Sequence, residues 1–388
     1  MKPDNAHLPR RGTPDFPLLF LTFSLVCFGL AMVFSASSAT SAVDVNIRDP
    51  WYYVKRQGAA IIIGTVGMLF CMNIRYSILK KWVVPLLFVT IVLLAAVIVV
   101  GEGPNGVKSW FDLGPLNFQP SELAKLSIVL YISALISKKG EKFRDFRTGL
   151  LPVLSVLGLI AALIMLQPDY GTCAILLLGA LTVIVVGGAN LKHLFLIGFF
   201  AASVASVGIT AFLLANPDYS DYKLNRITSY LDPWADPLFT GYHLIQSLYA
   251  FGHGGIWGAG FGQSIQKLHY LPEAHNDFIF AIIAEELGFI GSSLFLLTYL
   301  LLIWRGIVVA LRCSDPFGTL AGIGIIAMIG FQAVINIGGV SGAIPVTGVT
   351  LPFISYGGSS MLVSLVGMGI LLGISREYNS AEKEKKRR

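Results

Sequence analysis

The chain has 388 residues, of which 55% are hydrophobic and only 13% are charged, and its mean hydropathy is +0.72. Soluble domains carry about 25% charged residues, so this composition excludes a water-soluble globular protein. Continuous apolar stretches recur along almost the whole chain, and a bilayer-spanning helix needs roughly 20 such residues. Because these stretches do not alternate with polar residues, they argue against a β-barrel and predict an all-α integral membrane protein.

We predict about ten transmembrane helices in a single polytopic domain that covers residues 1–388. The predicted spans are 16–35, 58–74, 82–100, 122–137, 150–166, 172–189, 193–214, 277–304, 319–343 and 358–374. Three cations, Lys2, Arg10 and Arg11, precede the first span as they would precede a signal peptide. The apolar core of this span is longer than the roughly 7–15 residues of a signal sequence, so we expect it to be retained.

Lysine and arginine residues set the orientation of these helices. With the N-terminus in the cytoplasm, the inner segments hold 20 of the 28 Lys and Arg residues and the outer segments hold 7. This asymmetry predicts that both termini are cytoplasmic, with a basic tail at 375–388 near anionic lipid. The net charge of +6 therefore reflects membrane orientation and does not indicate a nucleic-acid partner. The four cysteines form no CxxC pair, and we expect them to be free.

The polar sequence gathers in the predicted outer loops, which are 36–57, 101–121, 167–171, 215–276 and 344–357. The loop 215–276, between the seventh and eighth spans, is by far the longest and is rich in Tyr, Trp, Gly, Pro and His. Long loops in compact proteins are usually functional or disordered, and this composition favours a functional loop. Its apolar piece Leu244–Phe251 is predicted to be re-entrant or to lie at the membrane interface. Glycines in the part 252–262 would allow the backbone to approach a phosphate closely, but their spacing matches no nucleotide-binding motif. A compact loop with tight turns explains these glycines equally well.

Two Asp-Pro steps, at Asp232 and Asp236, lie four residues apart near the start of this loop, with Lys223 and Arg226 just upstream. Proline biases the preceding aspartate away from the α-region, which favours a series of turns with fixed carboxylates. Such a carboxylate can take a proton from a hydroxyl or help to hold a divalent cation. Turn formation alone also explains aspartate at these positions.

The loop ends with a cluster of four titratable residues, His269, Glu273, His275 and Asp277. Their spacing matches no zinc motif, so we do not predict a zinc site. A cap on the following helix by Asn276 or Asp277 is a structural explanation for part of this cluster.

A few charges lie within the predicted spans. Glu285 and Glu286 lie about 12–14 Å along the eighth span, where a charge is costly unless it faces a cavity or a partner. Glu122 and Lys125, three residues apart, share one face at the start of the fourth span. They are predicted either to form a structural pair or to present charge to a ligand.

Hydroxyl and glycine residues mark the start of the last span, where Ser359 and Ser360 end the segment 344–360. These groups are predicted to cap the helix or to bind an anion at its N-terminus.

Several of these segments match motifs of one known family. They are Gln119-Pro-Ser-Glu122, Gln167-Pro-Asp-Tyr-Gly-Thr172, Asp232-Pro-Trp-Ala-Asp-Pro237, Leu271-Pro-Glu-Ala-His275 and Leu351-Pro-Phe-Ile-Ser-Tyr-Gly-Gly-Ser-Ser360. The chain thereby resembles, over nearly its whole length, the SEDS family (shape, elongation, division and sporulation), and within it the FtsW and SpoVE branch. One departure is Lys108-Ser109-Trp110, where the family pattern leads us to expect Arg directly before the Trp.

The resemblance implies a peptidoglycan glycosyltransferase that polymerises lipid II, a disaccharide-pentapeptide on undecaprenyl pyrophosphate, outside the cytoplasmic membrane during division or sporulation. By motif position the family's catalytic aspartate is Asp236, which would act as the general base on the acceptor hydroxyl. The further candidates for substrate binding are Glu122, Lys125, Arg226, Lys267, His275, Ser359 and Ser360.

The resemblance also implies partners and a place in the cell. A class B penicillin-binding protein would cross-link the new strand, alongside other division or sporulation membrane proteins, at the septum. A divalent cation, Mg²⁺ or Mn²⁺, is a possible cofactor for the pyrophosphate leaving group, and no organic cofactor is expected. The main alternative is a lipid II flippase, with Glu285 and Glu286 lining the path of the head group. A scaffolding division protein, whose charged outer face would only bind partners, ranks third. An ion-coupled carrier ranks last, because such carriers often show internal repeats and none is evident.

Overall fold

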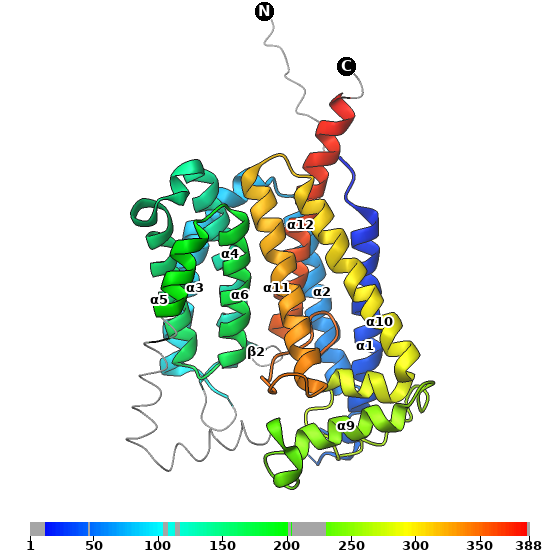
Figure 1. Ribbon diagram of the computed structural model, residues 1–388. Helices are drawn as coiled ribbons and strands as arrows, with labels where there is room; N and C mark the ends of the chain where they lie inside the picture. Colours follow the sequence, from blue (N-terminus) through cyan, green and yellow to red (C-terminus); the bar gives the residue numbers. More distant parts are fainter. Residues whose placement is uncertain are drawn as a thin grey trace, which may run out of the picture.

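The computed structural model describes residues 12–45, 47–103, 108–112, 117–200, 203 and 230–385, and these form a bundle of membrane-length helices (Figure 1). Eight of the described helices are long and apolar enough to cross a membrane. They are α1 (Phe16–Val43), α2 (Tyr52–Asn73), α3 (Tyr76–Val100), α4 (Pro120–Lys139), α5 (Leu151–Met165), α10 (Ile279–Leu311), α11 (Pro316–Val340) and α12 (Gly358–Lys385). The predicted all-α membrane fold is confirmed.

Helix α5 reaches membrane length together with the residues before it, as Phe146–Met165. Two further apolar helices, of 10–17 residues, are too short to count with these eight. They are α6 (Tyr170–Val186), which matches the sixth predicted span, and Leu191–Phe200, which matches the start of the seventh. The rest of the seventh predicted span, to residue 214, lies outside the described residues apart from residue 203. The count of ten spans and their sidedness therefore stay predictions.

Short elements occupy the connections between the helices. They are β1 (Phe111–Asp112), β2 (Asn117–Phe118), η2 (Gly140–Arg144), η3 (Phe146–Leu150), η4 (Pro233–Ala235) and α9 (Tyr242–Gly254). The strands β1 and β2 pair antiparallel, with Phe111 opposite Phe118. Helix α9 includes the apolar piece Leu244–Phe251 and lies across the end of the bundle at which α1 finishes and α10 begins (Figure 1).

Aspartate caps start three of the helices. Asp15, Asp169 and Asp315 each accept a hydrogen bond from the backbone N–H three residues later. Proline then lies in the first turn of α1 and of α11, where its missing N–H leaves no helical hydrogen bond unmade. The start of α10 differs, because its N-cap is Phe278 and no side chain caps it. The predicted cap by Asn276 or Asp277 is therefore wrong.

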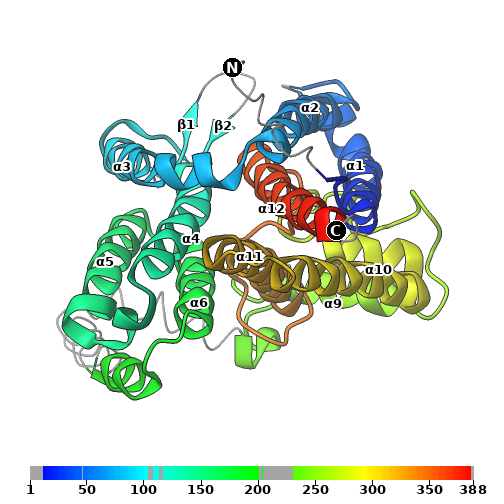
Figure 2. The same cartoon turned by 90° about the horizontal axis from the view of Figure 1, so that it is seen from above.

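Helix α12 lies at the centre of the bundle, between α2, α10, α11 and α4 (Figure 2). Small residues allow its close approach to α2. A Cβ atom added at Gly369 would lie 2.4 Å from the carbonyl oxygen of Met68, and one at Gly64 would lie 2.7 Å from the side chain of Leu365. Glycine-mediated packing of this kind is common between membrane helices, where close van der Waals contact drives association.

The beginning of α1 meets the end of α12. Asp15 accepts two hydrogen bonds from the Arg305 guanidinium, and its backbone N–H donates to Ser375 Oγ. The Gly12 N–H donates to the carbonyl of Arg376. The start of the first described helix and the end of the last therefore lie at the same face of the bundle, as the prediction of two cytoplasmic termini requires.

The first predicted outer loop, 36–57, is wrong at both ends. Helix α1 continues to Val43 and α2 begins at Tyr52, so only the short segment between them connects the two helices. Within the serine-rich end of α1, the hydroxyls of Ser37 and Ser41 donate to carbonyls one turn earlier, so these polar groups are satisfied inside the helix. Polar composition alone had suggested a loop there.

Candidate functional site

A large polar cavity, with a volume of about 1180 Å³, opens among the connections at the end of the bundle where α1 finishes and α10 begins. Its wall comes from the start of α2, the described parts 101–103, 108–112 and 117–119 of the connection between α3 and α4, the start of α4, the start of α6, and the segments 273–277 and 348–358. Four of the five motifs that carry the family resemblance meet here, although they are far apart in the sequence. The cavity is large enough for a sugar head group, because ligand sites typically measure about 300–1,000 Å³.

Glu122 and Lys125 form a buried ion pair at the floor of this cavity. Lys125 Nζ lies 2.8 Å from Glu122 Oε1 and 2.6 Å from Gln332 Oε1 on α11. The amide of Gln332 in turn donates to the carbonyl of Thr350 and to Ser360 Oγ. Glu122 lines the cavity, whereas the charge of Lys125 is already shared between a carboxylate and an amide oxygen.

Amide side chains from α2 and α11 hold the segment 344–357 in place, and a serine at the start of α12 joins the strand β2 to the start of α4. Gln57 on α2 donates to the carbonyl of Ser355 and accepts from the Gly357 N–H. Asn336 on α11 donates to the carbonyls of Asp277 and Val349, at 2.7 Å each. Ser359 Oγ donates to the Asn117 carbonyl and accepts from the Gln119 N–H. Ser359 and Ser360 are thus engaged in joining elements around the cavity.

His275 lines the cavity between two tyrosines. Its ring centroid lies 4.1 Å from that of Tyr53 and 5.7 Å from that of Tyr356. Burial lowers the pKa of His275 to about 4, so the imidazole is neutral at physiological pH. In this state it can stack and exchange hydrogen bonds with a ligand, but it brings no charge.

Asp277, two residues further on, also faces the cavity. Burial raises the pKa of its carboxyl group to about 7, and the carboxylates of Glu273 and Asp169 add to this shift. Asn336 fixes the Asp277 backbone, but no described residue donates a hydrogen bond to its carboxylate oxygens. Sequence analysis considered Asp277 as one of four clustered titratable residues and as a helix cap, but it did not name Asp277 as a substrate-binding residue.

Acidic residues outnumber basic residues in the cavity wall. The lining carboxylates are Glu102, Asp112, Glu122, Asp169, Glu273 and Asp277, against the cations Arg56 and Lys108. With Lys125 beneath Glu122, the described wall still carries a negative excess when all six carboxylates are ionised. Lys223 and Arg226, whose structure is outside the described residues, are not part of this balance.

Asp236 lies on the exposed turn that follows η4, and it is not among the residues that line the cavity. Its Oδ2 accepts hydrogen bonds from the Thr240 N–H at 3.1 Å and from Thr240 Oγ at 2.8 Å. These bonds lower the pKa of Asp236 below its ordinary value, so it is ionised throughout the neutral range. Asp232, by contrast, accepts from the Trp234 N–H within the turn itself.

The predicted substrate-binding residue Lys267 lies at a second, smaller cavity of about 350 Å³, between the end of α1 and the segment 261–268. Its Nζ is buried, 2.8 Å from Glu286 Oε1 and 3.1 Å from Ser35 Oγ. Lys267 is therefore separate from the residues that line the large cavity, and its charge is balanced by Glu286.

Glu285 and Glu286 hold the glycine-rich segment against α10. Glu285 accepts from His253 Nδ1, Ser264 Oγ and the Ile265 N–H. Neither glutamate lines the large cavity. In the flippase alternative, the lipid II head group would pass these two glutamates. Such a path would not run through the large cavity.

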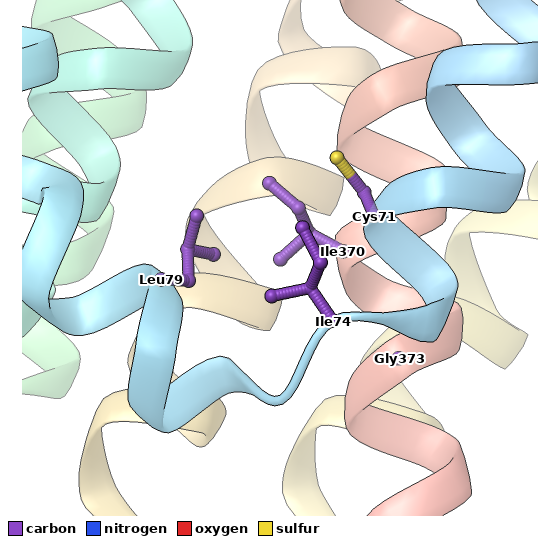
Figure 3. A pocket seen from close by; sticks show the side chains of 5 residues that line it. All are labelled: Cys71, Ile74, Leu79, Ile370 and Gly373. Atoms are coloured by element: carbon purple, nitrogen blue, oxygen red, sulfur yellow. The ribbon is translucent and has the colours of Figure 1, made fainter.

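The third hollow is too small and apolar to be a site. It measures about 20 Å³ and is enclosed by Cys71, Ile74, Leu79, Ile370 and Gly373 where α2 connects to α3 (Figure 3). A space lined this way stays dry and offers no polar group to a ligand. The four cysteines are free, as predicted.

Metal ligands do not cluster in the described part of the chain: no group of three or more His, Cys, Asp or Glu side chains there could hold a metal ion. The described residues thus provide no complete metal site by themselves. Mg²⁺ commonly binds through one or two carboxylates together with substrate phosphates, so this geometry does not decide whether a cation accompanies the substrate.

Sequence analysis missed the amides that organise the site. Gln57, Gln332 and Asn336 are each buried. Gln332 and Asn336 lie one turn apart in the otherwise apolar part of α11, whereas Gln57 follows Lys55 and Arg56 near the start of α2. A lone amide in a membrane span is a usable signal, because its burial is costly unless it is hydrogen-bonded. The charged residues drew attention instead, although these amides connect α2 and α11 to the segments that form the cavity wall.

The model of one protein family matches residues 16–380 of this chain, and its description is cell cycle protein of the FtsW, RodA and SpoVE type. Stage V sporulation protein E of Bacillus subtilis is 42% identical over 369 residues, which cover 95% of this chain and 98% of that protein. A probable peptidoglycan glycosyltransferase FtsW of Geobacter metallireducens is 39% identical, over 93% of this chain and 94% of its own length.

Solved structures agree with these relatives. A chain of a peptidoglycan synthase complex, studied for the coordination of polymerisation and crosslinking, superposes with a TM-score of 0.75 at 32% identity, over 94% of this chain and 98% of that one. The rod shape determining protein RodA of Thermus thermophilus gives a TM-score of 0.67 at 31% identity, over 94% and 97% of the two chains.

Proposed function

Because the chain belongs to the FtsW, RodA and SpoVE family of cell cycle proteins, we propose that it is a peptidoglycan glycosyltransferase. It would polymerise lipid II into glycan strands on the outer face of the cytoplasmic membrane during division or sporulation. The observation that carries this proposal is the large polar cavity among the outer connections, which is sized for a sugar head group and lies at the end of a membrane-embedded bundle. A polyprenyl chain can remain in lipid while its head group reacts there.

The reaction joins an acceptor hydroxyl to the anomeric carbon of a donor sugar, with a pyrophosphate as the leaving group. Asp236 is suited to take the acceptor's proton, because it is exposed, ionised and fixed by Thr240. General base catalysis of this kind typically contributes about 10²–10⁴-fold. Lys125 and Glu122 act as a pair that shapes the cavity floor, and Arg56 and Lys108 are the wall cations available to the pyrophosphate.

The test is glycan polymerisation from purified lipid II by wild type and by Asp236→Ala, with Asp232→Asn as the matched control. We expect Asp236→Ala to lose about 10²-fold or more of the activity, and Asp232→Asn to keep it, since asparagine can still cap the turn. If Asp236→Ala makes normal amounts of polymer at equal expression, Asp236 is not the general base. Lipid II transport without polymer from wild type would favour the flippase.

A divalent cation remains part of this proposal. Chelation with EDTA is expected to reduce polymerisation and added Mg²⁺ or Mn²⁺ to restore it, because the wall carries a negative excess that an anionic pyrophosphate must meet. The midpoint of thermal unfolding without substrate should not change, as no cluster of metal ligands occurs in the described residues. Full activity in EDTA would remove the cation from the mechanism.

The partner we propose is a class B penicillin-binding protein, which would cross-link the strands at the division septum. The neighbour from a peptidoglycan synthase complex supports this choice. Co-purification with such a transpeptidase, and an increase in polymer length or rate on adding it, are the expected results. Uniform distribution of the tagged protein around the cell membrane would contradict the septal location.

A further inference from the structure

The segment 254–266, which follows α9, has a composition unusual for a loop exposed to water. It contains no Asp, Glu, Lys or Arg, yet it places four large apolar residues at the surface. They are Ile256, Trp257, Phe261 and Ile265, and Trp257 is 81% exposed. Apolar surface residues that lie together mark a contact with a membrane or with another protein. The outer side of this uncharged segment therefore calls for an apolar neighbour.

Backbone hydrogen bonds attach the uncharged segment to α10 at its break. The Ile290 N–H donates to the Ile256 carbonyl at 3.2 Å, and the Phe289 N–H donates to the carbonyl of the preceding residue at 2.9 Å. Phe289 itself is 71% exposed. Figure 2 shows the loop after α9 at the edge of the bundle, beside α10 and α1. The backbone at Ile256 and Trp257 thus lies against the first exposed turn of α10 after the break.

From this turn onward, α10 presents an apolar stripe at its surface. The exposed residues Ile290, Leu294, Leu297, Leu301 and Trp304 recur at intervals of three or four, which places them on one helix face. Helix α10 is one of the membrane-length helices, so an exposed apolar stripe along it faces acyl chains. The stripe begins at Ile290, where the uncharged segment is attached. The apolar residues of that segment therefore continue the lipid-facing surface of α10.

The backbone of the uncharged segment sets how deeply it can enter a bilayer. Within the described part of the chain, no group accepts a hydrogen bond from the N–H of Phe261 or of Gly262. Unpaired backbone groups are costly in the hydrocarbon core, but they find water and polar partners among the head groups. Tryptophan is enriched at this same level of the membrane. Both features favour the interface over the core.

We propose that the uncharged segment binds a lipid surface, the outer leaflet of the membrane that holds α10. Trp257 and Phe261 enter the boundary between head groups and acyl chains, to a depth of about 5–10 Å. The buried ion pair of Lys267 with Glu286 ties the loop to α10, so the contact fixes the level of the outer loop relative to the membrane. None of these residues lines the large cavity, and the proposal does not depend on the substrate that reacts there.

The experiment measures tryptophan fluorescence of the full-length chain, without partner or substrate, in lipid nanodiscs. The lipids are unmodified, brominated near the head group, or brominated near the ends of the acyl chains, because bromine quenches a tryptophan that it contacts. The contribution of Trp257 is the difference between wild type and Trp257→Phe, which keeps an apolar aromatic side chain. We expect bromine near the head group to quench most of this contribution, bromine at the chain ends to quench less, and iodide in the water to quench little.

Two matched variants calibrate the response. Trp304→Phe reports a side chain on the lipid-facing stripe of α10, which brominated lipid should quench. Trp234→Phe reports an exposed aromatic side chain of the same outer loop that lies between Asp232 and Asp236, which iodide should quench. A second reporter, Phe261→Trp in the Trp257→Phe background, should reproduce the Trp257 pattern four residues further along. The midpoint of thermal unfolding verifies that each variant is folded.

Quenching of both reporters by iodide, with no effect of either brominated lipid, would overturn the proposal. The exposed apolar residues would then stand in water and would be available to a protein partner. Strongest quenching by bromine at the chain ends would also contradict it, because the segment would lie in the core. Since no lipid II is present, the result leaves the proposed glycosyltransferase activity to be decided by the polymerisation assay.

Discussion

At the scale of single residues, the buried contact between Lys267 and Glu286 joins the outer loop to α10. Both side chains are nearly inaccessible, at 7% and 0% exposure, and Glu286 Oε2 has no hydrogen-bond partner. A buried pair of this type adds little net stability compared with apolar residues, but loss of one partner leaves an uncompensated charge.

This difference can be measured with a double-mutant cycle. We expect Lys267→Met alone to lower stability by about 3–5 kcal/mol, and the double variant Lys267→Met with Glu286→Gln to lose clearly less. The midpoint of thermal unfolding in detergent gives the ordering. A double variant as unstable as the sum of the two single variants would mean that the two side chains do not interact.

A second residue-scale prediction concerns Thr240, whose N–H and hydroxyl both hold Asp236 ionised. In Thr240→Val the backbone donor remains and the hydroxyl is lost, so the pKa of Asp236 rises towards its ordinary value. The base must be ionised to act, so activity should be lost at a higher pH as the solution is acidified. Thr240→Ser, which keeps the hydroxyl, should follow wild type in the pH–rate profile. If the acid limbs of the pH–rate profiles are identical for Thr240→Val and wild type, the ionisation of Asp236 does not control the rate.

At the scale of elements, α10 is interrupted at Gly288, which has φ 66° and ψ −168° within an otherwise helical segment. The segment after α9 fills the break. The N–H groups of Ala259 and Gly260 donate to the carbonyls of Glu285 and Glu286, and those of Phe289 and Ile290 donate to the carbonyls of Gly255 and Ile256. Backbone groups freed by the break are therefore satisfied by another stretch of backbone.

Gly288→Ala tests this junction. The new Cβ would lie 2.2 Å from the Gly258 nitrogen in a conformation that side chains rarely adopt, so we expect a loss of about 1–3 kcal/mol or more in stability. Gly252→Ala is the matched control on α9, where a Cβ meets nothing within 4 Å. It should leave the unfolding midpoint unchanged or slightly raised. Equal behaviour of the two variants would show that the break tolerates a side chain.

Hydropathy predicts the elements well where long apolar stretches make them. Nine predicted spans each coincide with a described helix over most of their length, because about 20 apolar residues leave the backbone little choice but a helix. Both ends agree to within a few residues for the spans 122–137, 150–166, 172–189 and 319–343, whereas α1, α2, α3, α10 and α12 each extend well beyond the prediction at one end. Hydropathy fails where polar residues continue a helix, as in α1 beyond residue 35, and where a helix is interrupted. Nothing in the composition of 277–304 marks the break at Gly288, because the break depends on the separate segment that fills it.

The candidate site divides in the same way. Motifs identified Glu122, His275 and the start of α12 as parts of one region, and the structure brings all three to one cavity or its edge. Lys267 precedes the motif that begins at Leu271, but it lines the smaller cavity instead. Its ion-pair partner, Glu286, lies beneath a different part of the loop. Which charged side chains converge is decided by the packing of distant helices, and sequence spacing does not contain that information.

At the scale of the whole molecule, the predicted orientation is testable by labelling. We expect a cysteine at Gln263, in the exposed outer loop, to react with an impermeant maleimide in intact cells. A cysteine at Glu141, in the connection between α4 and α5, should react only after the membrane is opened, because 20 of the 28 Lys and Arg residues lie in segments assigned to the cytoplasm. The native cysteines are first replaced to give an unlabelled background. Reaction of both sites in intact cells would refute the assigned topology.

The way the outer loop joins α10 also decides how freely its sequence can vary. The four hydrogen bonds at the break use only main-chain groups, so Ile256, Trp257 and Ala259 can be exchanged for many residues without loss of the junction. Gly258 and Gly288 have no such freedom, because each Cβ would strike the opposing main chain. A saturation library of residues 256–262 and 285–290 should therefore keep Gly258 and Gly288, together with the buried Glu285 and Glu286, and should tolerate exchange at Ile256, Trp257 and Ala259. Short affinity tags or fluorescent probes can be placed at those permissive positions to follow the enzyme from its outer face.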